Sequence, residues 1–173
     1  MYNLRQVKKE IRVLSIASKP FRDGNRFHLV GIVFRGRLCL DGVMRTTAEG
    51  PDVTGDAIRM VKGSPHHPQI RVILLDADLI GHGASIDPYA LSIGASRPVI
   101  AINYDDSRRP VGNESGKTFK LKYDETPVPA LSVGLRSRVA LKVLETVSHG
   151  KSMPEALKVA KLVASAISED YLT

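Results

Sequence analysis

The stretch RVILLDADLIGHGASID, residues 71–87, decides the fold of this chain. Its aliphatic run, Ile70 with residues 72–75, is typical of a strand buried on both faces of a mostly parallel sheet. The run ends at Asp76, and a Gly-rich loop follows. Ligands of open α/β sheets usually bind beyond the carboxyl ends of the strands, so Asp76 is a candidate catalytic or metal-binding group. The alternative is that Asp76 and Asp78 belong to a solvated turn.

Length and composition favour one domain over residues 1–173, because 173 residues suffice for one full hydrophobic core and are few for two. The chain has no apolar run of the roughly 18 residues that a membrane span requires. Its basic N-terminus is not followed by the apolar segment of a secretory signal. The single cysteine, Cys39, cannot form an internal disulfide. A cytoplasmic protein with no membrane partner is therefore expected.

The charge of the chain favours a polyanionic partner. Lys and Arg outnumber Asp and Glu by 25 to 18, which gives a formal net charge of +7. Neutralisation of phosphates by such side chains dominates affinity for DNA or RNA. Solubility alone is the other explanation of a basic chain. With five Tyr, four Phe and no Trp, few stacking platforms exist, which argues against a dedicated single-strand binder.

Three strands are expected before the central one. Residues 10–17 form the first, and two more apolar runs, residues 27–34 and 38–44, flank a tight hairpin in which Gly36 takes a positive φ. An amphipathic helix follows and is expected to end at Gly63. The chain thus begins with an antiparallel sheet.

A βα unit follows the central strand. Asp87 and Pro88 are typical of an N-cap and a first helical position, and Gly94 is expected to end this helix. Residues 97–103 form another buried strand. Since βαβ crossovers are right-handed in nearly all proteins, this strand is expected to lie parallel to the central one.

The next segment is polar. Residues 104–117 form a loop, and residues 118–123 alternate as in an edge strand. Pro127 and Pro129 lack the backbone N–H that a sheet ladder needs, so a central position in the sheet is not expected there.

Two helices are expected at the end of the chain. The first has an apolar face that includes Leu135 and stops near Gly150, and the second begins at a capping box, Ser152 to Glu155. Three antiparallel strands, a helix and then parallel βα units predict an α/β protein with a mixed sheet and helices on both faces. That is the arrangement of ribonuclease-H-like nucleases.

Four segments carry a resemblance to a known family. They are EIRVLSIASKPF (10–21), VGIVFRGRLCLDGVM (30–44), the run from residue 71 to 103, and GKSMPEALKVAKLVASAI (150–167). The chain resembles the archaeal domain of unknown function ninety-nine family, which is similar to endonuclease V. The resemblance implies a ribonuclease-H-like fold and cleavage of nucleic acid near deaminated purines by carboxylates that hold Mg²⁺.

The resemblance also implies a catalytic set that this chain retains in part. Asp76 matches the aspartate of the central strand, and Glu49 or Asp52 is the candidate for the glutamate that follows the third strand. The aspartate of the first strand is replaced by Ala17, and the histidine of a late helix is replaced by Leu135. Residues that act as one constellation fail together, so a largely degenerate nuclease centre is expected.

The remaining metal site is expected to be weak. Mg²⁺ prefers an octahedron of oxygens, and Asp76 with Asp78 supplies few of them. His82, between two glycines beyond the central strand, is either a further ligand or base, or an exposed loop histidine. Weak or absent Mg²⁺ binding is therefore expected.

Several basic residues are candidates for contacts with phosphates, either along the predicted edge strand or in the polar loop. They are Arg108, Arg109, Lys117, Lys120, Lys122 and Arg136.

Two functions follow as expectations. The first is a divergent endonuclease-V-like protein associated with DNA or RNA, with deaminated bases as the target; any remaining activity would be that of a Mg²⁺-dependent endonuclease. The second is a non-enzymatic interaction or regulatory module that binds a protein or a small anion at the sheet crevice or edge. The oligomeric state is left open by the sequence.

Overall fold

The computed structural model describes residues 2, 4, 6–81, 83–104, 116–123 and 125–167. The strands are β1 (Arg12–Pro20), β2 (Arg26–Arg35), β3 (Cys39–Glu49), β4 (Val72–Asp76), β5 (Val99–Ile102), β6 (Gly116–Tyr123) and β7 (Thr126–Val133). The helices are α1 (Thr54–Gly63), α2 (Ala77–Ile80), α3 (Pro88–Ala95), α4 (Ser137–Val147) and α5 (Glu155–Ala166). Within these described residues no helix has the length and apolar character needed to cross a membrane.

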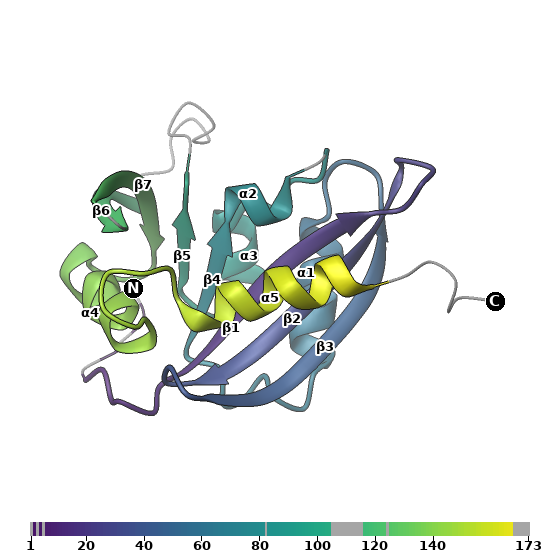
Figure 1. Cartoon of the computed structure of the whole chain (residues 1–173). Coiled ribbons are helices and arrows are strands. Elements are labelled where there is room, and N and C mark those ends of the chain that lie inside the picture. The colour runs from purple at the N-terminus through teal and green to yellow at the C-terminus, as the bar shows by residue number, and fades with distance from the viewer. Residues whose placement is uncertain are drawn as a thin grey trace.

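One sheet of seven strands organises the molecule, in the order β3-β2-β1-β4-β5-β7-β6. Helices α1 and α3 pack on one face of this sheet, and α4 and α5 pack on the other (Figure 1). Each face therefore has its own hydrophobic core. The predicted mixed sheet with helices on both faces is confirmed.

Strand β4 lies at the centre of the sheet, and every one of its residues is buried. It runs parallel to β1, with Ile16 opposite Leu75, and parallel to β5, with Asp76 opposite Ile102. The next residue of β1 after Ile16 is Ala17, so Ala17 and Asp76 lie at neighbouring strand ends. Both the central strand and the parallel crossover strand are confirmed.

The first three strands form the predicted antiparallel unit. Gly36 in the β2–β3 hairpin has a φ of +60°, and a Cβ at this position would collide with the backbone carbonyl of Lys9. Only glycine combines this backbone conformation with such a close approach at little cost. The predicted hairpin is confirmed.

Of the two glycines that were expected to end helices, Gly63 does so and Gly94 does not. Asp87 caps α3 as predicted, because its carboxylate accepts a hydrogen bond of 2.8 Å from the backbone N–H of Tyr89. However, α3 continues through Gly94, and Ser96 takes the left-handed conformation with φ of 54°. Gly63 is the last residue of α1, as predicted, and Ser64 follows it at the cap position in an extended conformation.

The region after the polar loop corrects a second expectation. Strand β6 is an edge strand, as predicted, but Pro127 and Pro129 belong to β7, which lies between β5 and β6. Strand β5 pairs only with residues 130–133 of β7. The two prolines therefore extend beyond β5 and have β6 as their only neighbouring strand, so their missing N–H groups disturb one ladder at most.

The last helix starts without the predicted capping box. Helix α4 ends at Val147, close to Gly150 as expected, but the residue that precedes α5 is Pro154 and no side chain caps its first turn. The Ser152 hydroxyl instead donates to the carbonyl of His149, at 2.8 Å. This hydroxyl is therefore not available to cap the first turn of α5.

Helix α5 crosses β1 and β2 on one face of the sheet (Figure 1). It buries small side chains at Ala156, Ala160 and Ala164. Alanine at this spacing brings a helix close to a sheet, because little side chain separates the backbones. The helix is thereby held over the carboxyl end of β1, next to Ala17.

Candidate functional site

Asp76 is the last residue of the central strand, and its side chain is only 1% exposed. Side chains alternate along a strand, so Asp76 projects to the same face as Leu74. Leu74 and Ala17 belong to the same hydrophobic core, which lies under α4 and α5. A carboxylate and a methyl group thus lie side by side on one face, at the carboxyl ends of two parallel strands.

One oxygen of Asp76 is well bonded and the other is not. Oδ1 accepts hydrogen bonds from the backbone N–H of Asp78, at 3.0 Å, and from Nδ2 of Asn103, at 2.9 Å. The same Asn103 amide donates to Oδ2 of Asp78 at 3.2 Å and so bridges the two carboxylates. Oδ2 of Asp76 is buried and has no hydrogen-bond partner among the described residues.

Burial raises the pKa of Asp76 above its ordinary value, since the charged carboxylate loses hydration. The hydrogen bonds from Asn103 and Asp78 and the charge of Lys161 oppose this rise, and the Asp78 carboxylate adds to it. The phenol of Tyr123 has a raised pKa for the same reason, burial first and the nearby Asp76 charge second. Burial is therefore the main influence on the pKa of both groups.

A hollow of about 310 Å³ opens beside Ala17, between the end of β1, α2 and α5. Its lining includes Asp78 and the exposed Lys161. Lys19 also lines it, but its ammonium group donates to the backbone carbonyls of Ser165, at 3.1 Å, and of Ile167. Lys19 therefore connects the end of β1 to the end of α5. The positive charge of Lys161 lies close enough to Asp76 to act on its pKa.

The structure brings Asp78 to Asp76, but it places the two candidates for the glutamate elsewhere. Glu49 ends β3, three strands away from β4 and so roughly 14 Å across the sheet, and it accepts a hydrogen bond from Asn25. Asp52 lies just before α1, which covers the opposite face. Hydrogen bonds from the hydroxyl and N–H of Thr54 lower the pKa of Asp52.

The position that the resemblance assigns to a histidine is part of the core. Leu135 is 3% exposed and packs in the same hydrophobic core as Ala17. An apolar side chain there supplies packing and no ligand. His82 lies outside the described residues.

The candidate phosphate-binding residues lie on two elements. Lys117, Lys120 and Lys122 are exposed on edge strand β6, and the alternation of the strand places Lys120 and Lys122 on one face and Lys117 on the other. Arg136 is exposed at the start of α4. Arg108 and Arg109 lie outside the described residues.

Two residues of the site were not predicted from the sequence. Asn103 follows β5, which is parallel to β4, so its position at the same end of the sheet as Asp76 was a usable signal. Its left-handed backbone, with φ of 56°, is one that asparagine adopts more readily than most residues. Lys161 comes from α5, and no local pattern relates it to Asp76.

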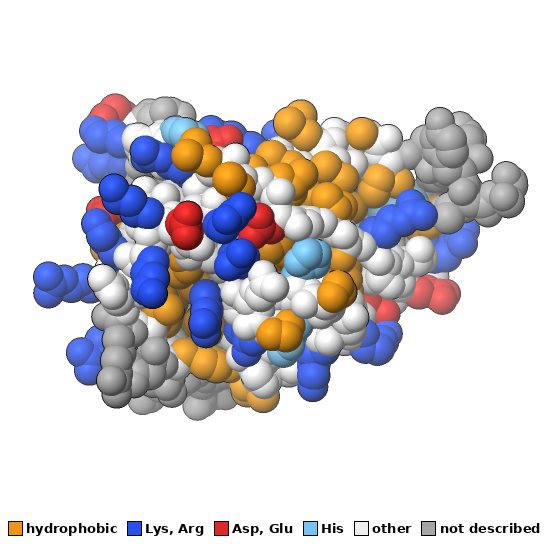
Figure 2. Space-filling view, turned by 90° about the horizontal axis from the view of Figure 1, so that it is seen from below, with side chains coloured by type: hydrophobic (Ala, Val, Ile, Leu, Met, Phe, Trp, Pro, Cys, Tyr) orange, Lys and Arg blue, Asp and Glu red, His pale blue; other side chains and the backbone are white. Residues whose placement is uncertain are grey.

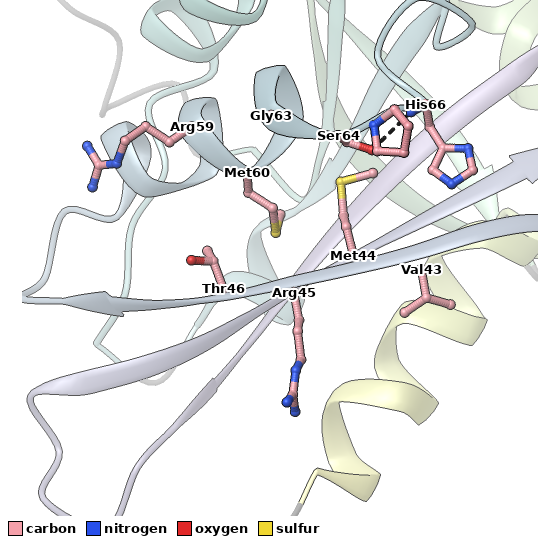
Figure 3. Close-up of a pocket in the computed structure, with 10 residues that line it drawn as sticks. Val43, Met44, Arg45, Thr46, Arg59, Met60, Gly63, Ser64 and His66 are labelled. Carbon is pink, nitrogen blue, oxygen red and sulfur yellow. Dashed lines mark hydrogen bonds between the residues drawn. The ribbon is translucent and has the colours of Figure 1, made fainter. Parts of the chain in front are cut away.

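A larger hollow, of about 460 Å³, lies between β3 and α1. Figure 3 shows Met44 and Met60 pointing into the space between these elements, whereas Arg45 points to the other side of β3. His66 lies at one end of this hollow, and no carboxylate among the described residues lines it. Its chemistry therefore does not suit metal-dependent hydrolysis, and Asp76 remains the candidate catalytic position.

The residues around Asp76 do not fit a magnesium ion. Mg²⁺ needs near-octahedral oxygen coordination, usually with carboxylates and water. Among the described residues only two carboxylates meet here, the Asn103 amide bridges them, and Lys161 adds positive charge. Across the described parts of the chain, no three His, Cys, Asp or Glu side chains are grouped closely enough to hold a metal ion.

Comparison with known proteins assigns the chain to a family. Residues 9–114 match the family model described as endonuclease dU. The chain belongs to the endonuclease dU family. A UPF0215 protein of Methanothermobacter thermautotrophicus is 32% identical over 96% of this chain and 92% of its own length. A UPF0215 protein of Methanopyrus kandleri is 33% identical over 96% of this chain and 95% of its own. The expected archaeal family is confirmed.

Solved structures show the fold of this endonuclease dU family member. A protein of Archaeoglobus fulgidus has a TM-score of 0.70 at 23% identity, and the match covers 91% of this chain and 98% of that protein. Endonuclease V of Streptomyces avermitilis has a TM-score of 0.64 at 14% identity, and the match covers 94% of this chain and 83% of that enzyme. Endonuclease V of Ciona intestinalis has a TM-score of 0.61 at 11% identity, and the match covers 95% of this chain and 87% of that enzyme. The ribonuclease-H-like fold is therefore confirmed.

Proposed function

We propose that this chain is a divergent endonuclease dU family member that associates with nucleic acid and has lost most of its metal-dependent cleavage. One observation carries the proposal: Ala17 lies next to Asp76, on the same face and at the carboxyl end of the neighbouring strand. Two carboxylates at such positions would converge on one cation. A methyl group supplies no ligand, so the cation loses one of its anionic partners.

The class of partner is inferred from the relatives. The family model is described as endonuclease dU, and the similar endonuclease V of Ciona intestinalis was solved with DNA that contains an inosine. Both names point to nucleic acid with deaminated bases. The net charge of +7 supports a polyanionic partner independently. Strands that contain deoxyuridine or inosine are therefore the first ligands to test.

Metal binding tests the loss of cleavage. We expect no calorimetric signal for Mg²⁺ or Mn²⁺ with the wild-type chain at millimolar concentrations, because the carboxylates of Asp76 and Asp78 are too few. Ala17→Asp should bind Mn²⁺ measurably, about 10-fold or more tightly, since it restores a second carboxylate at the adjacent strand end. Ala17→Asn is the matched control, with the same size and no charge, and should not bind.

Two results contradict this part of the proposal. One is tight Mn²⁺ binding by the wild-type chain. The other is cleavage of deoxyuridine- or inosine-containing strands that Asp76→Asn abolishes. Circular dichroism spectra of both Ala17 variants separate a missing metal site from a failure to fold, because Ala17 is buried.

Nucleic-acid binding is tested by fluorescence anisotropy with labelled DNA and RNA strands of about 20 nucleotides. Affinity should fall steeply with added salt, because bound cations are released from the phosphates. Failure to bind any strand at low salt would remove nucleic acid as the partner. A preference for strands with deoxyuridine or inosine would identify the target base.

A second function, binding of a small anion in the crevice without catalysis, is favoured by Lys161, whose exposed ammonium group lines the hollow beside Ala17. Calorimetry with inorganic phosphate tests it. Binding that Lys161→Gln abolishes supports this function, and no binding by the wild-type chain rules it out.

A further inference from the structure

Six cationic side chains gather at the end of the sheet opposite Asp76. They are Lys8, Lys9, Arg12, Arg35, Arg37 and Arg71, and together they are named the basic pole. They come from the start of β1 and the segment before it, from the end of β2 and the β2–β3 hairpin, and from the residue that precedes β4. Residues about 60 positions apart in the sequence therefore share one surface.

Backbone hydrogen bonds hold these segments together. Arg12 lies opposite Arg35 in the β1–β2 ladder, and the N–H of Arg71 donates to the carbonyl of Arg12 at 2.9 Å. The N–H of Gly36 donates to the carbonyl of Ile11 at 2.9 Å, which brings the hairpin to the start of β1. The basic pole is thus a built surface in which several strands fix the backbone.

The loop that carries Arg71 is also held from the other side. The guanidinium group of Arg97 donates to the carbonyls of Ile70, at 2.6 Å, and of His67, at 2.8 Å. The side chain of Arg97 is therefore committed to backbone acceptors and positions the loop. Arg71 itself remains exposed.

The charge of the basic pole is only partly compensated. Asp41 pairs with Arg12 at 2.7 Å and with Arg35 at 3.3 Å, so one carboxylate serves two guanidinium groups. Glu10 is the other acid within these segments. Six cations against two acids leave an excess of four positive charges, more than half of the net +7 of the whole chain.

Four members of the basic pole direct their charge to solvent. Lys8, Lys9, Arg37 and Arg71 are exposed and have no ion-pair partner among the described residues. Figure 2, which views the molecule from below Figure 1, shows Lys and Arg side chains spread over this side and only a few acidic ones among them. A polyanion would meet mainly cations on this surface.

The opposite end of the sheet has a different charge balance. Asp76, Asp78 and Glu49 lie there, and the ammonium group of Lys19 is committed to carbonyls of Ser165 and Ile167. Lys161 is the exposed cation that lines the hollow at this end. The hollow beside Ala17 therefore offers a phosphate chain fewer uncommitted cations than the basic pole does.

We infer that the basic pole binds the phosphodiester backbone of nucleic acid, at the end of the sheet opposite Asp76. This inference rests on the nucleic-acid binding proposed above and adds where the strand lies. Guanidinium groups match phosphate oxygens in geometry, and backbone contacts of this kind carry no base specificity. The strand is then held away from the degenerate centre, so the protein binds nucleic acid without needing to cut it.

Charge reversal tests the inference. The pole variant carries Lys9→Glu, Arg37→Glu and Arg71→Glu, and the matched control carries Lys117→Glu, Lys120→Glu and Lys122→Glu on edge strand β6. All six side chains are exposed and both variants change the net charge equally. Binding of a labelled 20-nucleotide DNA or RNA strand is followed by anisotropy across a salt series.

The pole variant should bind about 10- to 100-fold more weakly at low salt, and its salt slope should be shallower by about 2, as expected for three lost phosphate contacts on a single strand. The β6 control should lose about 3-fold or less, which reflects net charge alone. A pole variant with Gln at the same three positions should show a smaller loss in the same direction. Melting temperatures confirm that all variants are folded.

Three results overturn the inference. Equal losses in the pole variant and the β6 control would show an effect of net charge alone, and a loss confined to the control would place the strand on β6. Binding of vesicles with anionic lipid that depends on the basic pole, without binding of DNA or RNA, would assign this surface to membranes. The proposed function fails if the wild-type chain binds no nucleic acid at low salt, as in the vesicle outcome, whereas the first two results leave it standing.

Discussion

Asp76 combines two properties that rarely occur in one carboxylate. It is almost completely buried, and one of its oxygens has no hydrogen-bond partner among the described residues. An unsatisfied buried acceptor costs about 1–3 kcal/mol of stability. In a metal-binding relative a cation would compensate such a group, but here Ala17 removes the partner carboxylate. Asp76 is therefore expected to reduce the stability of the folded chain.

Replacing Asp76 by Asn should raise the free energy of unfolding at pH 7, by about 1 kcal/mol, because the amide removes the buried charge and still accepts bonds from Asp78 and Asn103. Since burial raises the pKa of the folded-state carboxyl, the cost of the charge is fully present above that raised pKa. It disappears as the pH falls below the ordinary value of 3.8. Urea unfolding with EDTA at pH 7 and near pH 4 measures the difference.

An advantage of Asp76→Asn that grows toward low pH would contradict this assignment of cost. The matched control is Asp78→Asn, which removes a partly exposed carboxylate and should change stability by less than about 0.5 kcal/mol.

Leu135 is the second position at which the resemblance to endonuclease V implies a residue, a histidine, that this chain lacks. Leu135→His should destabilise the protein by about 2–4 kcal/mol, because it removes buried apolar volume and buries an imidazole. Leu135→Met conserves the volume and should cost less than about 1.5 kcal/mol. Denaturant midpoints decide the matter, and equal stability of the two variants would show that the position still accommodates a polar group.

At the scale of elements, the packing of α1 on α3 depends on one missing side chain. A Cβ on Gly94 would collide with the side chain of Ile58 in α1. Glycine inside a helix normally lowers its stability by about 0.5–1 kcal/mol relative to alanine. Here it is retained because it allows two helices to lie in direct contact on one face of the sheet.

Gly94→Ala should therefore destabilise the chain by about 1–2 kcal/mol, the opposite of the usual effect of alanine in a helix. In an Ile58→Ala background the same change should be neutral or stabilising, since the collision is gone. A double-mutant cycle measured by denaturant unfolding gives the coupling between the two positions. A coupling close to zero would mean that the helices do not meet at this contact.

At the scale of the whole molecule, the sheet order predicts how stability is distributed. Strands β1 and β4 have a paired strand on each side and hydrophobic cores on both faces, whereas β6 is at the edge. Amide exchange requires these ladders to open, and central strands open only in the largest fluctuations.

Native-state hydrogen exchange should therefore be slowest in β1 and β4 and faster in β6, by about two orders of magnitude. Mass spectrometry of peptides from these strands measures the rates. The outer half of β7, residues 126–129, should exchange with β6, because β5 does not pair with it. Exchange of β6 at the rate of β4 would show that another contact covers this edge.

The sequence by itself determined the features that depend on local pattern. The aliphatic run of residues 70 and 72–75, the Gly36 hairpin and the Asp87 cap were predicted correctly, because hydrophobic period and turn chemistry act over a few neighbouring residues. The position of Asp76 at the end of the central strand and its neighbour Ala17 followed from the expected parallel pairing.

Tertiary structure alone decided the features that depend on distant partners. The prolines of β7 were compatible with a strand because β5 is too short to flank them, and the glycine at position 94 makes room for Ile58 inside α3 and does not end that helix. The Asn103 bridge and the basic pole likewise join segments far apart in the chain. Such contacts are set by how the whole sheet is assembled, and no local window of the sequence records that assembly.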